Sequence, residues 1–168
     1  IQLGALARRH GDLTAAAAHL DKALQREPSS AAAHSNLGNV FLGWGRLREA
    51  EASYGRALQL LPRYPEALTN LGVLRGRQGR WGEALRLHQA ALKVSPERPE
   101  VLGNAAVAML ELGRFAEAEE LLRRVLGQGQ HSASVLHSLG GSLEGQAKMA
   151  SAVAAYEQAT RLEPTYAK

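Results

Sequence analysis

Residues 31–64 read AAAHSNLGNVFLGWGRLREAEASYGRALQLLPRY, and this 34-residue segment decides the fold because the chain repeats its pattern. Its marker is Ser35-Asn36-Leu37-Gly38. The same register holds these segments at multiples of 34 residues: Gln2-Leu3-Gly4, Thr69-Asn70-Leu71-Gly72, Gly103-Asn104-Ala105-Ala106 and His137-Ser138-Leu139-Gly140. A fixed period between about 20 and 50 residues is typical of proteins built from stacked copies of one supersecondary unit.

Further markers keep this period and predict where the helices break. A step of glycine, a polar residue and a large residue recurs, altered in its last copy: Gly11-Asp12-Leu13, Gly45-Arg46-Leu47, Gly79-Arg80-Trp81, Gly113-Arg114-Phe115 and Ala147-Lys148-Met149. Prolines close four repeats at Pro28, Pro62, Pro96 and Pro164. Glycine suits a tight turn with positive φ, and proline ends a helix. We therefore expect two antiparallel helices per repeat, at about repeat positions 2–14 and 17–30.

On these markers the whole chain resembles the tetratricopeptide repeat family, whose 34-residue pattern is W-x2-L-G-x2-Y, then A-x3-F, then P. Repeat 31–64 matches at Leu37, Gly38, Phe41, Ala50, Tyr54, Ala57 and Pro62. Repeat 133–166 matches at Leu136, Leu139, Gly140, Leu143, Ala152, Tyr156, Ala159 and Pro164. Repeat 65–98 has Arg75 and His88 where large apolar residues are usual. Repeat 99–132 is degenerate and departs from the pattern at Ala105, Ala106, Val125 and Gln130.

The resemblance implies an all-α fold, a right-handed α-solenoid of antiparallel helix pairs with about five repeats. A single helix pair cannot bury its apolar faces, so the repeats stack, with the first helices lining a concave groove. The expected divisions of this single array are 1–30, 31–64, 65–98, 99–132 and 133–166. Residues 167–168 would begin a further repeat, and the first repeat begins inside its first helix, so we expect a longer array.

The composition agrees with a helical protein. Only 5% of the residues are aromatic, whereas alanine and leucine recur throughout, which argues against a β-sandwich or barrel. The chain has no run of 18 apolar residues, so no membrane span is expected. No signal peptide is visible, and a cytoplasmic location is slightly favoured over others. The absence of cysteine excludes disulfides and thiolate chemistry.

The charge is uneven along the chain. Residues 1–98 carry 14 basic and 8 acidic side chains, and residues 99–168 carry 6 and 8. The arginines of the basic part are interleaved with glutamates such as Glu49, Glu83 and Glu97, and they are not clustered with aromatic residues. This pattern is typical of solvated helix faces, and no nucleic-acid partner is expected.

No catalytic or metal-binding motif stands out. The chain has six histidines, no cysteine and no His-x3-His pair, so we expect neither a metal nor a cofactor, and no enzyme activity in this chain. His34 and His88 take positions of large packing residues and are interpreted as partly buried. Serine and histidine are adjacent at residues 34–35, 131–132 and 137–138, so their side chains point in different directions.

One feature indicates binding. Asn36, Asn70 and Asn104 recur at one first-helix position, with Gln2 and Ser138 in register, and we call these three asparagines the asparagine ladder. An interior asparagine costs a helix roughly 0.5 kcal/mol relative to alanine. Its amide donates and accepts, as a peptide unit does. The ladder resembles that of the O-linked N-acetylglucosamine transferase superhelix, where such asparagines hold extended substrate backbone. Alternatively, these amides bond to neighbouring repeats and hold the stack together.

The predicted peptide-binding residues lie on the first helices. They are Asn36, Asn39, Thr69, Asn70, Val73, Arg77, Asn104, His137 and Ser138. The carboxylate clamp of chaperone-binding repeats is not assembled, because Ser35, Glu100 and Asn104 stand where that clamp has basic residues. We therefore do not expect binding to a chaperone C-terminal tail.

The favoured function is a non-enzymatic scaffold that binds an extended peptide or partner segment in the groove. The expected partner is a protein or an extended peptide. Two alternatives stay open. The chain could be the substrate-recruiting arm of a larger enzyme such as a glycosyltransferase, or a scaffold that self-associates through the ends of the solenoid.

Overall fold

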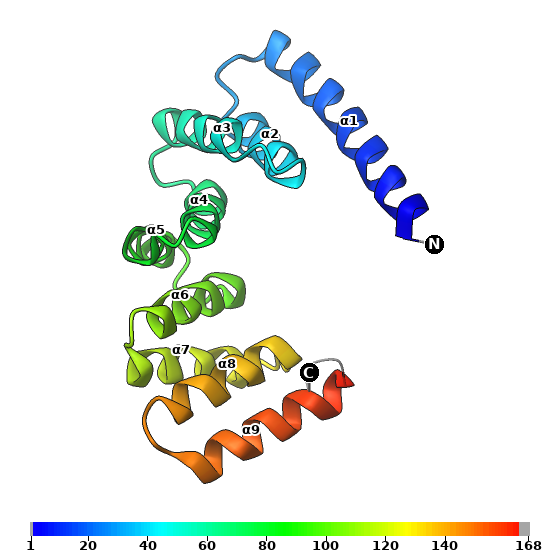
Figure 1. Ribbon diagram of the computed structural model, residues 1–168. Helices are drawn as coiled ribbons and strands as arrows, with labels where there is room; N and C mark the ends of the chain where they lie inside the picture. Colours follow the sequence, from blue (N-terminus) through cyan, green and yellow to red (C-terminus); the bar gives the residue numbers. More distant parts are fainter. Residues whose placement is uncertain (1, 165–168) are drawn as a thin grey trace. The chain divides into compact units, whose positions relative to one another are not determined.

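The computed structural model describes residues 2–164, with the side chains of residues 11–164, and this part of the chain is helical (Figure 1). The helices are α1 (Gln2–Arg26), α2 (Ala31–Gly43), α3 (Leu47–Leu60), α4 (Pro65–Arg77), α5 (Trp81–Val94), α6 (Pro99–Glu111), α7 (Phe115–Gly127), α8 (Ala133–Glu144) and α9 (Met149–Leu162). From α2 onward, each helix lies within two residues of its predicted range. The predicted all-α fold of paired helices is confirmed.

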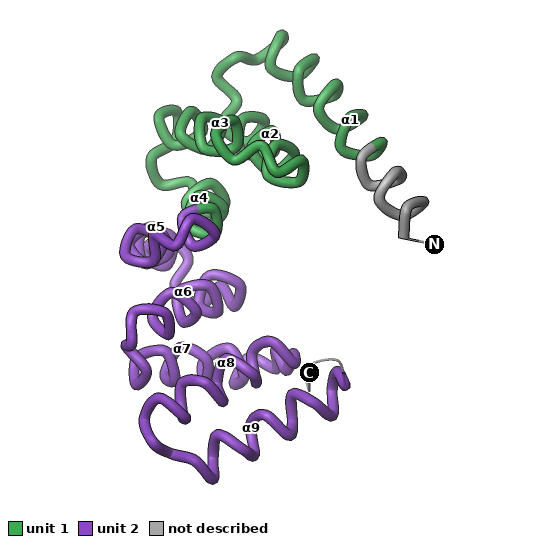
Figure 2. The backbone as a smooth tube through the Cα atoms, in the orientation of Figure 1, with its two compact units in different colours: residues 1–74 green, residues 75–168 purple. Residues whose placement is uncertain are grey.

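The chain divides into two compact units, residues 1–74 and residues 75–168 (Figure 2). In unit 1, α2 and α3 form a pair, and α1 packs on α2. In unit 2, each helix from α5 to α9 packs on the next one, and α6 also contacts α8. The first helices of two successive repeats, α6 and α8, are therefore direct neighbours.

The predicted glycine turns are present in three repeats. Gly45, Gly79 and Gly113 have φ of 73°, 72° and 72°, in the left-handed region that favours glycine. Ala147 takes the same place in the last repeat and adopts φ of 59° in spite of its Cβ. In repeat 99–132, which lacks the closing proline, Gly129 with φ of 78° makes the turn after α7.

The predicted break at Gly11 is wrong. α1 continues through Gly11 as one helix of 25 residues, and Gly11 has no positive φ. An added Cβ would meet no atom within 4 Å at Gly11, and the same holds at Gly45, Gly79 and Gly113, so open space around the glycine does not decide whether the chain turns. The run Ala15–Ala18 that follows Gly11 favours continued helix.

Close helix contacts at glycine build the two cores. In unit 1, Tyr54 is fully buried with Ala50 and Leu74, and its ring covers Gly38, where an added Cβ would lie 2.5 Å from the ring. Tyr156 covers Gly140 of unit 2 in the same way. The larger core of unit 2 runs from α5 to α9.

The two histidines interpreted as packing residues are placed accordingly. His88 is 2% exposed, and its Nδ1 has no hydrogen-bond partner among the described residues. Burial lowers the pKa of His88 to about 4. His34 is half-buried, and its Nε2 donates to the Pro28 carbonyl at 3.0 Å.

Candidate peptide-binding surface

In unit 1, two of the predicted binding residues form one hydrogen-bonded group. Asn70 Nδ2, on α4, donates to Asn39 Oδ1, on α2, at 2.8 Å. The hydroxyl of Tyr54, on α3, donates to the same oxygen at 2.7 Å. Asn39 Oδ1 is therefore used twice inside the protein. The Asn39 Nδ2 donors and the Asn70 Oδ1 acceptor have no partner among the described residues.

This group can meet both halves of a peptide unit. A free amide donor on Asn39 suits a carbonyl oxygen, and a free acceptor on Asn70 suits a peptide N–H. The internal hydrogen bonds fix both side chains before a ligand arrives, which lowers the entropy cost of binding. The same Asn39–Asn70 bond also joins neighbouring repeats, as the alternative interpretation of the ladder expects. Tyr54 was not foreseen as a member, because the sequence indicated it only as a core residue.

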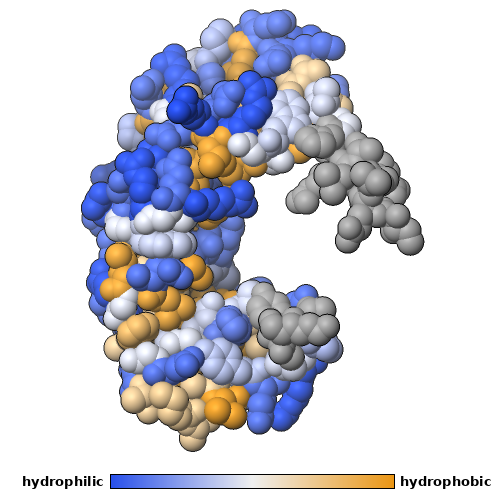
Figure 3. Space-filling model, in the orientation of Figure 1, coloured by the Kyte–Doolittle hydropathy of each residue, from blue (hydrophilic) through white to orange (hydrophobic). Residues whose placement is uncertain are grey.

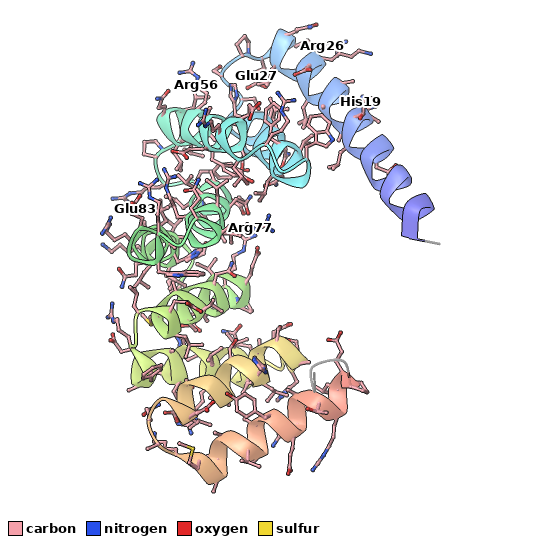
Figure 4. All side chains as sticks on the ribbon, viewed as in Figure 1. His19, Arg26, Glu27, Arg56, Arg77 and Glu83 are labelled. Carbon is pink, nitrogen blue, oxygen red and sulfur yellow. The ribbon has the colours of Figure 1, made fainter. Side chains whose placement is uncertain are left out.

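The other predicted residues of α2 and α4 differ in exposure. Asn36 is exposed, and its side chain makes no hydrogen bond to a described residue. Val73 is half-buried. Arg77 is exposed at the last turn of α4 (Figure 4). Thr69 is only 3% exposed, and its hydroxyl has no partner in the described part of the chain. We leave Thr69 out of the candidate surface because its side chain points into the protein.

In unit 2, α6 and α8 enclose a groove of about 410 Å³. Asn104 on α6 and Ser138 on α8, both predicted binding residues, lie in its lining. Val107 and Val135 form apolar walls, and Leu122 of α7 lies at the floor. The volume is within the range usual for ligand sites, about 300–1,000 Å³. Val135 was not among the predicted binding residues. The 34-residue register could have indicated it, because α8 must lie beside α6.

The remaining predicted residue, His137, lies on α8 but does not line this groove. It is exposed, and its ring centroid lies 5.2 Å from that of Tyr156. The Tyr156 hydroxyl donates to Glu144 Oε2 at 2.8 Å. Burial, with Glu144 as the second cause, raises the pKa of Tyr156 to about 12, so the phenol is neutral at physiological pH.

The candidate surface carries little charge. Glu100 is the one ionisable residue in the lining of the α6–α8 groove. Several arginines elsewhere are paired with glutamates, as in Arg46–Glu49, Arg80–Glu83 and Arg114–Glu117. Within the described residues, no group of three or more histidine, aspartate or glutamate side chains could hold a metal ion. None of the described helices is both long enough and apolar enough to cross a membrane.

Comparison with known proteins gives family and structural matches. Models described as tetratricopeptide repeat match residues 1–67 and 36–85, residues 77–143, and residues 133–166. The solved structure of pilF from Pseudomonas aeruginosa is 28% identical, with a TM-score of 0.80 over 95% of this chain and 73% of that chain. No match was found among curated protein sequences.

Two further solved structures show the fold alone. MamA is 20% identical, with a TM-score of 0.78 over 95% of this chain and 94% of that chain. YrrB, described as a TPR protein with an unusual peptide-binding site, is 22% identical, with a TM-score of 0.76 over 92% of this chain and 79% of that chain.

Proposed function

The chain belongs to the tetratricopeptide repeat family, whose members generally mediate protein–protein interaction, and we propose that it is a non-catalytic scaffold that binds an extended peptide segment of a partner on its first helices. The observation that carries this proposal is the hydrogen-bonded pair of Asn39 and Asn70. One free donor and one free acceptor are held side by side on neighbouring repeats. Asn104 and Ser138 in the α6–α8 groove add uncharged polar groups of the same kind.

The proposed contacts favour backbone over side-chain recognition. Amides and hydroxyls can donate and accept, so they pair with any peptide unit whatever its side chain. An extended strand offers a peptide unit every 3.3 Å or so, which allows each repeat to meet one.

The sharpest test replaces Asn39 with aspartate. Asn39→Asp keeps an oxygen that accepts from Tyr54 and Asn70, but it removes the Nδ2 donors and places a negative charge before the peptide carbonyl. The probe is the nine-residue peptide that is enriched most from a random display library selected against the full chain. Its affinity, measured by fluorescence anisotropy, is expected to fall about fivefold or more, the equivalent of one or two hydrogen bonds.

The matched control is Gln158→Ala, which removes an exposed side-chain amide from α9. It should leave the affinity unchanged. Circular dichroism should show the parent helix content for both variants. Failure of the library to yield any binding peptide would overturn the proposal, and so would an unchanged affinity of the folded Asn39→Asp variant.

A second candidate function, self-association through the end of the array, is favoured by the surface of α9. Met149 and Val153 are 55% and 56% exposed and lie on one stripe of the helix with Tyr156 and Thr160. Apolar surface is visible in Figure 3 where α9 begins. Glu157 and Arg161 border this stripe on the same helix.

The corresponding position of α7, one repeat earlier, indicates how such a stripe packs. Phe115 of α7 stands 34 residues before Met149, and its ring covers Gly145 at the end of α8. The stripe of α9 is therefore suited to contact another helix. Sedimentation velocity over a concentration series tests whether that helix comes from a second copy. Val153→Glu should then shift the chain to monomer, whereas a parent chain that is monomeric at every concentration contradicts self-association.

A further inference from the structure

The α6–α8 groove contains a hollow that other repeats fill with a side chain. Gly103 occupies the register position of Ser35 and Thr69, which are 1% and 3% exposed. A Cβ added at Gly103 would meet no atom within 4 Å. The absence of a side chain at this point of α6 leaves open space in front of the helix.

The walls of this hollow are apolar. Leu122 and Val125 of the unit 2 core lie at its floor, at 0% and 1% exposure. Val107 on one side is 37% exposed, and Val135 lines the other side. An apolar side chain that entered here would cover Val107 and displace water from an apolar surface, which is favourable.

The charge at the rim of the groove determines which charged residue of a bound peptide can lie near that side chain. The side chain of Glu100 is 61% exposed, and its Oε2 lies 3.9 Å from Arg98 Nε, which is long for an ion pair. No lysine or arginine lines the groove within the described residues. The rim therefore favours a cation and disfavours an acidic segment.

We propose that the hollow in front of Gly103 is a side-chain pocket that receives one apolar residue of an extended peptide, with a lysine or arginine of the same peptide at Glu100. This inference rests on the proposed function, because it assigns the sequence preference of the segment bound there. The Gly103 pocket distinguishes one partner segment from another.

The test is a double-mutant cycle between protein and peptide. The probe is again the peptide enriched most from the random nine-residue library, which should hold a leucine, isoleucine, methionine or phenylalanine near a lysine or arginine. Replacement of its apolar residue by serine should weaken binding to the parent chain by about tenfold or more. Gly103→Leu fills the hollow, so the same peptide change should then have almost no effect.

Three further variants sharpen the result. Gly55→Leu makes the same change on α3, where an added Cβ also meets nothing within 4 Å, and it should behave as the parent. Val107→Ser removes part of the wall without filling the space, and it should reduce the apolar preference. Glu100→Gln should lower affinity for the basic peptide about two- to fivefold and reduce the salt dependence of binding.

The outcomes separate this proposal from the one on which it rests. A peptide that binds in an Asn39-dependent way, with no coupling to Gly103, overturns the pocket and leaves the proposed function standing. A library that yields no binding peptide overturns both. A dimer that forms without peptide and is lost in Gly103→Leu shows that a second copy fills the pocket, which overturns the peptide assignment.

Discussion

At the scale of single residues, Ala147 has a backbone conformation that its side chain disfavours. Its φ of 59° matches that of the glycines 34, 68 and 102 residues earlier. A residue with a Cβ pays about 1–2 kcal/mol for this left-handed conformation. Ala147→Gly removes that cost but increases the entropy of the unfolded chain. We expect a net gain of about 0.5–1 kcal/mol in the free energy of unfolding, measured by urea denaturation.

The reverse change provides the control for this prediction. Gly113 makes the same turn one repeat earlier, with φ of 72°. Gly113→Ala should destabilise the chain by about 1 kcal/mol. Equal stability of parent and Ala147→Gly, with a clear loss in Gly113→Ala, would show that the α8–α9 turn tolerates alanine for reasons other than its φ.

The binding residues show how far single positions can be read from sequence. The register predicted that Asn70 and Asn104 lie on first helices, and it placed Asn39 beside them. It could not predict that Asn70 bonds to Asn39 instead of Asn36, because that depends on how far neighbouring helices are displaced along their axes. It also placed Thr69 on the surface, although the side chain is buried.

At the scale of helices, two adjacent glycines of α8 should respond oppositely to the same change. A Cβ on Gly140 would overlap the ring of Tyr156, whereas a Cβ on Gly141 would meet only the Tyr156 hydroxyl, at 3.7 Å. Gly140→Ala should therefore cost about 1–3 kcal/mol through overpacking. Gly141→Ala should be neutral or stabilise by up to about 1 kcal/mol through helix propensity.

Thermal unfolding followed by circular dichroism measures both variants. The pair controls itself, because the two sites are neighbours on one helix and receive the same methyl group. A similar loss in both would mean that α8 does not tolerate alanine for a reason unrelated to Tyr156. A loss in neither would mean that Tyr156 moves away without cost.

The helices themselves were largely predictable, with α1 as the exception. The turns at Gly45 and Gly113 join helices that pack on each other, α2 on α3 and α6 on α7, and the sequence pattern indicates that packing. At Gly11 the same step of glycine, polar residue and large residue is present, but α1 stays continuous, and the run Ala15–Ala18 favours helix. The motif alone therefore does not determine a turn.

Ion pairs at the start of the second helices show a similar limit. Arg46, Arg80 and Arg114 each pair with a glutamate three residues later. Lys148 has the same register but a serine at the glutamate position, and it donates instead to Glu119 of α7, at 2.9 Å. The hydrogen bond from Lys148 lowers the pKa of Glu119 below its usual value of 4.5. The sequence of the last repeat alone does not show that Lys148 pairs with a residue of the preceding repeat.

At the scale of the whole molecule, these titrating groups make folding sensitive to acid. Glu119 has a lowered pKa in the folded state. Its contribution to the stability of the fold is therefore present above pH 4.5 and is lost as the pH falls through its folded pKa. His88 is buried in its neutral form with a pKa of about 4, against 6.5 in the unfolded chain. The unfolded chain therefore binds a proton at His88 between pH 6.5 and 4 that the folded chain does not. Both groups destabilise the protein as the pH falls.

His88 dominates the upper part of this range, and its effect can be isolated. The difference between the two pKa values corresponds to about 3 kcal/mol in the free energy of unfolding. This stability is fully present above pH 6.5 and is lost as the pH approaches 4. His88→Leu introduces leucine, the residue found at the same repeat position in Leu122, and it removes the titrating ring. Urea denaturation at pH 7.5 and 4.5 measures how much the free energy of unfolding decreases between the two pH values. This decrease should be about 2–3 kcal/mol smaller in His88→Leu than in the parent. His131→Leu, which removes an exposed imidazole, should keep the loss of the parent. An identical loss in all three proteins would mean that solvent reaches His88 and protonates it in the folded state.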